Sequence, residues 1–186
     1  MSWFLFFTEK FSLENNMKKV IVIGCPGGGK STFARQLHTM TKLPLYHLDM
    51  LYWNKDRTTV QREVFVERLG RAIAQDEWII DGNYSSTMEM RMEACDTVFF
   101  LDYPIQLCLE GIAARKGKAR TDMPWVEETD DEDFLQFVRK FREESRPDII
   151  RLLDRHNDRQ IVIFHNREEA SDYLDSYRQK WLETEL

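Results

Sequence analysis

The stretch GCPGGGKST at residues 24–32 constrains the fold of this chain more than any other feature of its sequence. It follows the apolar run VIVI at 20–23 and precedes a segment of helical composition at 30–41. The four fixed positions of the pattern G-x-x-x-x-G-K-[ST] are occupied by Gly24, Gly29, Lys30 and Ser31. Strand, glycine-rich loop and helix in this order are the context that a phosphate-binding loop requires. The sequence therefore predicts a strand that ends at a nucleoside triphosphate.

The residue types in this loop suit the binding of a triphosphate together with Mg²⁺. Glycines have unrestricted φ angles, so a tight loop aims successive backbone N–H groups at oxygen, and the helix N-terminus adds a partial positive charge. Lys30 is expected at the β- and γ-phosphates, and the hydroxyl of Ser31 is expected on Mg²⁺. The residues expected to bind the nucleotide, either ATP or GTP, are Gly24, Gly27, Gly28, Gly29, Lys30, Ser31 and Thr32.

Short apolar runs alternate with helical segments along the chain. The runs expected to be strands lie at 20–23, 43–48, 77–81, 97–102 and 160–164. The segments expected to be helices lie at 30–41, 60–75, 105–116, 132–145, 147–156 and 167–183, with Pro147 separating two of them. Nearly continuous apolar runs are typical of strands covered on both faces. Their alternation with helices predicts an α/β fold with a parallel sheet and right-handed crossovers.

This pattern begins at Met17 and continues without an internal repeat or a low-complexity linker. We therefore expect one domain over residues 17–186, a size that suits a single hydrophobic core. Residues 1–16 open with MSWFLFF but have neither the basic start nor the cleavage site of a signal peptide. We expect them to be a peripheral N-terminal extension.

The composition of the 186 residues favours an ordinary globular protein and argues against several classes of partner. Hydrophobic residues make up 42% and charged residues 31%, and no apolar run approaches the roughly 20 residues that span a bilayer. The formal net charge of −6 provides no overall cationic field, so DNA is disfavoured as a partner without being excluded. Cys25, Cys95 and Cys108 have no C-x-x-C spacing, which favours free thiols in the cytoplasm over disulfides or a zinc site.

Three of the expected strands end in an aspartate: Asp49, Asp81 and Asp102. A single aspartate at a strand end also suits a turn or a helix cap. In open parallel sheets, however, the carboxyl ends of the strands line the ligand crevice. Because this sheet also carries the phosphate-binding loop, we expect all three carboxylates to lie near the phosphates.

The motifs GCPGGGKST, YHLDMLYW, WIIDGNYSSTMEMR and FFLDYP together resemble the adenylate-kinase-like P-loop NTPase family. Within it, HLDMLYW and DGNY are most similar to the subgroup of DNA topology modulation (FlaR-type) proteins. The resemblance covers residues 18–175. It implies a three-layer fold with a five-stranded parallel sheet, helices on both faces, and a small helical lid at about residues 115–133.

The resemblance also implies roles for individual residues. Asp81 corresponds to the acid that holds Mg²⁺ through water, and Asp49 lies where related kinases orient and deprotonate an acceptor. Asn83, Tyr84 and Arg91 are implied as acceptor contacts. True adenylate kinases carry a proline-arginine pair after their D-G, whereas this chain has Asn83 and Tyr84, which argues against AMP as the acceptor. His47 alternates to the other side of its expected strand from Asp49, so we do not pair these two in catalysis.

Basic residues gather in the implied lid. The cations of the segment ARKGKARTDMPW are Arg115, Lys116, Lys118 and Arg120, with Gly117 available as a hinge. Arginine's planar fork suits the charge of a moving phosphoryl group, so Arg115 and Arg120 are expected to stabilise it. The acidic run EETDDED at 127–133 has two interpretations. It is either a solvated loop that leads into a helix N-terminus, or a latch that pairs with the lid arginines until ATP arrives.

These residues favour an ATP-dependent kinase. Phosphoryl transfer depends on positioning and charge stabilisation, for which the candidate catalytic residues are Lys30, Asp49, Arg115 and Arg120. The implied cofactors are ATP and Mg²⁺, and the implied partner is a small-molecule acceptor that the sequence does not identify. Two other classes stay open, a nucleotide-dependent regulator of DNA topology and an ATPase that acts on a protein partner. Aromatic candidates for stacking on an acceptor are Tyr46, Trp53, Tyr84 and Trp125.

Overall fold

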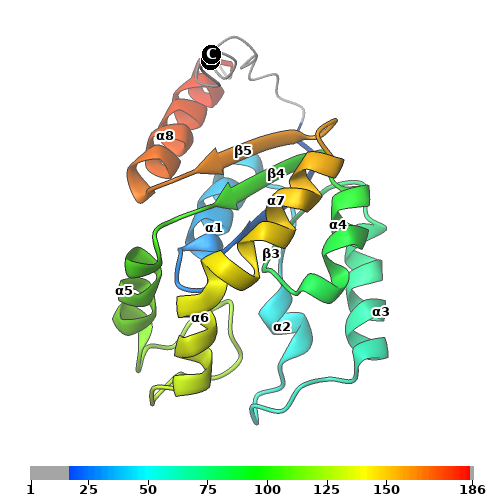
Figure 1. Cartoon of the computed structure of the whole chain (residues 1–186). Helices are drawn as coiled ribbons and strands as arrows, with labels where there is room; N and C mark the ends of the chain where they lie inside the picture. The colour runs from blue at the N-terminus through cyan, green and yellow to red at the C-terminus, as the bar shows by residue number, and fades with distance from the viewer. Residues whose placement is uncertain (1–16, 185–186) are drawn as a thin grey trace.

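The computed structural model describes residues 17–184, which are built around a five-stranded parallel sheet (Figure 1). The strands are β1 (Lys19–Gly24), β2 (Leu45–His47), β3 (Trp78–Asp81), β4 (Thr97–Leu101) and β5 (Gln160–Phe164). Their order in the sheet is β2-β3-β1-β4-β5, and every pairing is parallel. The predicted fold class is therefore confirmed. The N-terminal extension expected at 1–16 lies outside the described residues.

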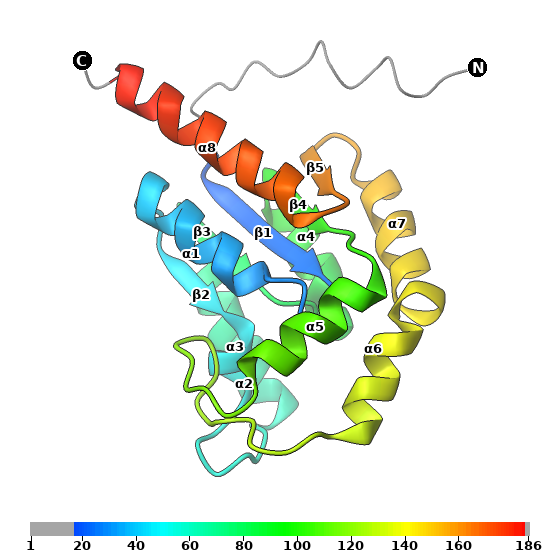
Figure 2. The same ribbon diagram turned by 90° about the vertical axis from the view of Figure 1, so that its left-hand side faces the viewer.

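Helices cover both faces of this sheet. They are α1 (Lys30–Thr41), α2 (Leu48–Tyr52), α3 (Arg62–Ile73), α4 (Met88–Ala94), α5 (Ile105–Arg115), α6 (Glu132–Glu144), α7 (Arg146–Arg155) and α8 (Arg167–Thr184), with a 3₁₀ turn at Ser85–Thr87. Figure 2 shows α1 and α8 on one face of the sheet, with α4 and α7 on the other. Among the described residues, no helix is long and apolar enough to cross a lipid bilayer.

The buried strands explain why their sequences are nearly continuous apolar runs. Every residue of β3 and β4 is buried, as is every residue of β1 after the first. On the α1 and α8 side, Phe33 packs against Phe99 with ring centroids 4.9 Å apart and against Phe164 at 5.5 Å. These contacts hold α1, and with it the phosphate-binding loop, against the centre of the sheet.

Two short helices were not expected from the sequence. The run expected as a strand at 43–48 contains only the three-residue β2, because α2 begins at Leu48, whose side chain is buried. Asp49 therefore lies in the first turn of α2, where an acid complements the helix dipole, and not at a strand end. The segment MEMRMEA, rich in strong helix formers, forms α4.

Asp102 corrects the expectation that all three aspartates lie near the phosphates. Its carboxylate is buried and accepts two parallel hydrogen bonds from Arg146, from Nε at 2.8 Å and from Nη2 at 2.7 Å. The expected break at Pro147 is confirmed, because α6 ends at Glu144 and Pro147 lies in the first turn of α7. The ion pair thus fixes the N-terminus of α7 at the end of β4.

The phosphate-binding loop lies directly on the backbone of α5. A Cβ atom added at Gly111 would lie 2.0 Å from the carbonyl oxygen of Gly27, and one added at Gly27 would lie 2.1 Å from the carbonyl oxygen of Cys108. Neither distance leaves room for a side chain. The two glycines therefore allow the loop and α5 to pack backbone against backbone.

We predict that Gly111→Ala destabilises the protein whereas Gly70→Ala, a matched change in the interior of α3, does not. At Gly70 the nearest atom to an added Cβ is Met90 Cε at 3.8 Å, and alanine favours a helix by about 1 kcal/mol over glycine. At Gly111 the overlap with the loop is expected to cost about 1–3 kcal/mol. Thermal unfolding followed by circular dichroism should show a lower Tm for Gly111→Ala and an equal or higher Tm for Gly70→Ala. Equal Tm values for the two variants would contradict the proposed packing.

Candidate active site

The phosphate-binding loop turns at glycines that adopt positive φ angles. The φ angles of Gly24, Gly27 and Gly29 are 145°, 81° and 87°, a region that favours glycine over other residues. Gly29 is the N-cap of α1, and no side chain caps this end of the helix. The first backbone N–H groups of α1 are therefore left for an anion.

Asn83 holds the start of this loop from the neighbouring strand. Its Oδ1 accepts a hydrogen bond from the Gly24 backbone N at 2.9 Å, and its Nδ2 donates to the Gly24 carbonyl at 2.7 Å. The side-chain amide is thus engaged with the backbone at the end of β1. Asn83 also lines the cavity described below, so its expected contact with an acceptor stays a prediction.

Lys30 is half-buried at the start of α1. Its Nζ donates to the Cys25 carbonyl oxygen at 3.1 Å. Burial lowers the pKa of this ammonium, while the nearby negative charges of Asp81 and Asp49 act in the opposite direction. A triphosphate adds negative charge beside Lys30 and so favours its charged form.

Asp49 and Tyr84 form a hydrogen-bonded pair at the other end of the site. Tyr84 donates from its hydroxyl to Asp49 Oδ1 at 2.7 Å. Burial raises the pKa of Asp49, and the hydrogen bond from Tyr84 partly offsets this effect. Asp49 lines the cavity, and its expected role toward an acceptor stays a prediction.

His47 contacts Asp81, a pairing that the sequence did not suggest. The two residues face each other in the register of β2 and β3, and His47 Nδ1 lies 2.7 Å from Asp81 Oδ1. The Asp81 side chain is buried. His47 thereby fixes the orientation of the carboxylate that is expected to hold Mg²⁺, and only strand register brings them together.

Asp122 is a second acid of the site that sequence reasoning missed. It is buried although it belongs to the loop between α5 and α6, and it accepts hydrogen bonds from Arg35 at 3.1 Å and Arg120 at 3.3 Å. Burial opposes its ionised form, but these two guanidinium groups and the Ser31 hydroxyl outweigh that effect and lower its pKa. A lone acid within the basic stretch ARKGKARTDMPW was the available signal.

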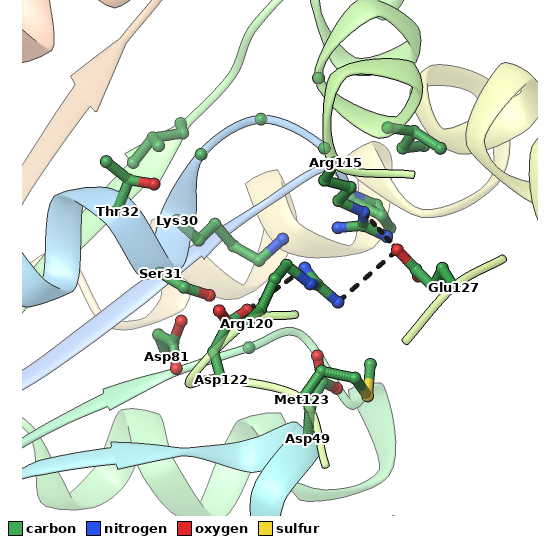
Figure 3. A pocket seen from close by; sticks show the side chains of 18 of the residues that line it. Lys30, Ser31, Thr32, Asp49, Asp81, Arg115, Arg120, Asp122, Met123 and Glu127 are labelled. Carbon is green, nitrogen blue, oxygen red and sulfur yellow. Dashed lines mark hydrogen bonds and ion pairs between the residues drawn. The ribbon is translucent and has the colours of Figure 1, made fainter. Parts of the chain in front are cut away.

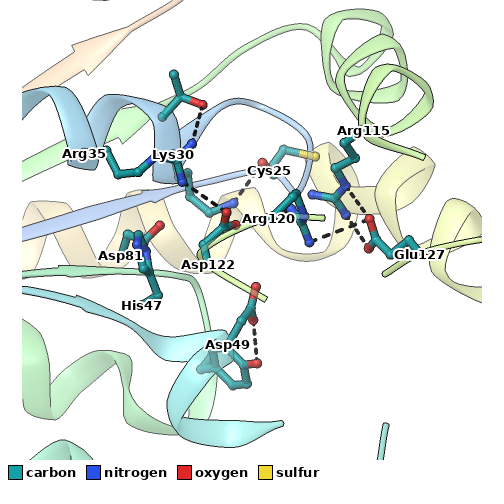
Figure 4. Close-up of polar contacts among 12 residues, drawn as sticks. Cys25, Lys30, Arg35, His47, Asp49, Asp81, Arg115, Arg120, Asp122 and Glu127 are labelled. Atoms are coloured by element: carbon teal, nitrogen blue, oxygen red, sulfur yellow. Dashed lines mark hydrogen bonds and ion pairs between the residues drawn. The ribbon is translucent and has the colours of Figure 1, made fainter. Parts of the chain in front are cut away.

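The lid expected at 115–133 begins at the end of α5 and contains no helix between residues 116 and 131. Glu127 lies between the two lid arginines, with Oε2 at 2.7 Å from Arg115 Nε and 3.7 Å from Arg120 Nη2 (Figure 4). Lys116 pairs with Asp130 at 2.7 Å. Asp131 caps α6 by accepting a hydrogen bond from Phe134 N at 3.0 Å. The acidic run thus both pairs with the lid cations and leads into a helix N-terminus.

Arg91 does not reach the site. Its side chain is fully buried and donates to the carbonyl oxygens of Gly82 at 2.8 Å, Tyr84 at 3.2 Å and Thr87 at 3.3 Å, and also to that of Asn83. Arg91 therefore shapes the turn after β3 and does not contact an acceptor. The sequence around Arg91 did not indicate that its guanidinium would bind backbone carbonyls.

One cavity of about 960 Å³ connects these groups (Figure 3). The expected site residues that line it are Gly27, Gly28, Gly29, Lys30, Ser31, Thr32, Asp49, Asp81, Asn83, Tyr84, Arg115 and Arg120. Gly24, Arg91 and Asp102 are not part of its lining. The volume lies at the upper end of the range of about 300–1,000 Å³ that is usual for small-molecule sites.

The donor set suits Mg²⁺ held jointly with a nucleotide. No cluster of three or more His, Cys, Asp or Glu side chains that could hold a metal occurs within residues 17–184. Mg²⁺ in phosphoryl-transfer sites takes only one or two protein ligands and completes its shell with water and phosphate oxygens. The Ser31 hydroxyl and the buried Asp81 carboxylate, both in the cavity lining, fit this arrangement.

The fold and this cavity define the chain as having the P-loop kinase fold. No protein-family model and no curated protein matches its sequence. Solved structures are similar in fold. Shikimate kinase from Acinetobacter baumannii in complex with shikimate has a TM-score of 0.58 and 17% identity, with 92% of this chain and 97% of that chain covered.

Two further structures show the same similarity. Shikimate kinase from Bacteroides thetaiotaomicron has a TM-score of 0.54 and 18% identity, with 90% of this chain and 99% of that chain covered. A gluconokinase from Sinorhizobium meliloti has a TM-score of 0.52 and 13% identity, with 90% and 93% covered. At these identities the likeness establishes the fold, and membership of the DNA topology modulation subgroup stays a prediction.

We predict that Glu127→Gln increases the affinity for ATP. Without its charge, Glu127 no longer competes with phosphate oxygens for Arg115 and Arg120, which we expect to lower the Kd about fivefold, or roughly 1 kcal/mol. The matched control is Glu128→Gln, because Glu128 is 71% exposed and faces Arg57 at 3.5 Å. Isothermal titration calorimetry with Mg·ATP measures both variants. Weaker ATP binding by Glu127→Gln would contradict the latch and indicate that Glu127 orients the arginines.

Proposed function

We propose that this protein is an ATP-dependent kinase that transfers the γ-phosphate of Mg·ATP to a hydroxyl group of a small molecule. The observation that carries this proposal is the composition of one cavity. Lys30 and the loop amides lie in one part of the cavity, Asp49 lies in another, and Arg120 lies between them, whereas Arg115 lies farther from Asp49 and is paired with Glu127 (Figure 3). This order matches the order of phosphate donor, moving phosphoryl group and acceptor that in-line transfer requires.

Each residue then has a defined role in the transfer. The acceptor oxygen forms a bond to the γ-phosphorus while the bond from that phosphorus to the β–γ bridging oxygen breaks, and ADP leaves. Asp49 accepts the proton of the acceptor hydroxyl through its free carboxylate oxygen. Lys30 stabilises the charge that develops on the phosphates. Mg²⁺, held by Ser31 and by Asp81 through water, supplies further charge neutralisation when it is bound.

The lid stabilises the moving phosphoryl group and excludes water. Arg120 Nη2 is buried, makes no hydrogen bond among the described residues and lies 3.7 Å from Glu127 Oε2, so a phosphate oxygen that displaces Glu127 would give this group its hydrogen-bond partner. Asp122 links Arg120 to Arg35 on α1, and thereby ties the lid to the helix that follows the phosphate-binding loop. Exclusion of water favours transfer to the acceptor over hydrolysis of ATP.

A regulator of DNA topology is less well supported by the same residues. The formal net charge is −6, and three of the four lid cations, Arg115, Lys116 and Arg120, are paired with acids. An ATPase that acts on a protein partner differs from a kinase in one measurable respect, because its turnover does not depend on an acceptor. Three buried free cysteines fit the proposed location in a reducing cytoplasm.

A turnover screen tests the proposed function directly. Purified protein is incubated with Mg·ATP and individual hydroxylated metabolites, and ADP release is measured together with the phosphorylated product. We expect ADP release that depends on one class of acceptor. ADP release at an equal rate without any acceptor would indicate an ATPase instead.

We predict that Lys30→Ala reduces turnover at least a hundredfold while the fold persists. Removal of one preorganised charge donor from such a site costs about 3 kcal/mol of transition-state stabilisation. Lys140→Ala is the control, because Lys140 lies on α6 with 47% of its side chain exposed. Turnover and circular dichroism are measured for both variants. Near-wild-type turnover of Lys30→Ala would remove Lys30 from the mechanism.

We predict that Tyr84→Phe shifts the acid limb of the turnover profile to higher pH. Asp49 acts as a base in its ionised form, so turnover falls as the pH drops through its raised pKa. The Tyr84 hydrogen bond lowers this pKa, and its loss therefore raises the pKa further. The control is Tyr52→Phe, because the Tyr52 ring lies 4.9 Å from the Tyr84 ring and its hydroxyl makes no hydrogen bond to Asp49. An unshifted limb in Tyr84→Phe would argue against Asp49 as the base.

A further inference from the structure

The acceptor end of the cavity has an aromatic wall. Trp53 at the end of α2 and Trp125 in the lid loop meet edge to face, with ring centroids 5.7 Å apart and planes at 81°. Tyr84, which hydrogen-bonds Asp49, lies in the same lining. The carboxylate that receives the acceptor proton is thus flanked by indole and phenol rings. Such rings bind the faces of other rings by stacking and by contact with C–H groups.

One polar group of this wall, the indole N–H of Trp125, is a hydrogen-bond donor without a partner among the described residues. This Nε1–H is also shielded from solvent. A buried N–H donor without a partner is costly, and most such groups in proteins are satisfied. Because Trp125 lines the cavity, a ligand oxygen or ring nitrogen is the group that satisfies it.

The charges at this end argue against an anionic acceptor. Arg91 is enclosed by backbone carbonyls, as described above. Arg57 lies over the Trp125 ring at 5.3 Å and donates to the Val126 carbonyl at 3.1 Å, with 52% of its side chain exposed at the rim. The carboxylate of Asp49 lines the cavity at this end, and the nearby cation Arg120 is already paired with Asp122 at 3.3 Å and Glu127 at 3.7 Å. A carboxylate or phosphate group of the acceptor would meet the like charge of Asp49 in a partly desolvated site.

Resting on the proposed kinase function, we propose that the acceptor is an uncharged, ring-shaped molecule that carries a hydroxyl group. Its ring packs against Trp53 and Trp125, a ring or exocyclic acceptor atom takes the Trp125 N–H, and its hydroxyl donates to Asp49. Two kinds of compound share this chemistry, namely nucleosides and uncharged cyclic sugars or polyols. A nucleoside stacks its base on the wall, whereas a sugar presents its C–H face.

Matched pairs of acceptors test this assignment. Phosphorylated product is measured with Mg·ATP and adenosine against AMP, cytidine against CMP, glucose against glucuronate, and methyl shikimate against shikimate. We expect kcat/KM at least about tenfold higher for the uncharged member of the preferred pair, since a like charge opposes binding. Transfer to the nucleosides identifies a nucleoside acceptor, whereas transfer to the uncharged sugar or polyol identifies a sugar or polyol acceptor.

Two outcomes distinguish failure of this inference from failure of the proposed function. Faster transfer to a nucleoside monophosphate or a carboxylate overturns the acceptor class and leaves the kinase intact. ATP binding without transfer to any uncharged member also overturns the acceptor class. Absence of ATP binding in calorimetry overturns the proposed function itself.

Variants of the wall provide a second measurement. Trp125→Phe keeps an aromatic ring but removes the N–H donor, and we expect the acceptor KM to rise about fivefold with the Kd for ATP unchanged. Trp53→Leu removes one ring, with an expected rise of about tenfold. The control is Met50→Leu. Met50 lies on α2, the helix that ends next to Trp53, but it is 43% exposed and does not line the cavity. Unchanged acceptor KM in both tryptophan variants would overturn the proposed wall.

Discussion

The close packing of the phosphate-binding loop on its neighbours is the constraint on which the rest of the structure depends. Gly27 lies against the backbone of α5 at Gly111, and Asn83 holds both backbone groups of Gly24. Because β1 lies between β3 and β4, the segments that follow both neighbouring strands contact the loop. The positions of Asp81, of the lid that follows α5 and of the helix α1 are consequently set relative to the same few atoms.

The same packing brings positive and negative side chains together in one cavity. Glu127 and Asp122 neutralise the lid arginines in the structure, while the half-buried Lys30 has a backbone carbonyl as its hydrogen-bond partner. Interactions between charges are stronger in a site with little water than at the surface. A triphosphate therefore competes with carboxylates for the same cations, and the balance between these pairings couples nucleotide binding to the lid.

The chemistry of the cavity changes along its length. Amides, Lys30 and arginines surround the phosphate end, whereas indole and phenol rings surround Asp49 at the acceptor end. This division follows from the chain path. The loop between α5 and α6 contributes Arg120 to one end and Trp125 to the other, so in the proposed kinase a single segment would contact both substrates. We therefore expect binding of the nucleotide and enclosure of the acceptor to be linked through this loop.

Local patterns of the sequence determined the strands and the phosphate-binding loop. Buried parallel strands require continuous apolar runs, and the glycine positions follow from backbone torsions, so both signals lie within a few consecutive residues. The short helices α2 and α4 were missed because helices of five and seven residues show too little periodicity.

Tertiary structure alone decided which charged groups became partners. Asp81 and Asp102 both lie at the ends of buried strands. Asp81 lines the cavity beside His47, whereas Asp102 forms an ion pair with Arg146. Arg91 lies on α4 and is enclosed by backbone carbonyls, whereas Arg120 lies in the loop between α5 and α6 and lines the cavity. The reason is physical, because a charge is stabilised by whatever the fold places within about 3–4 Å of it, and sequence separation does not determine that distance.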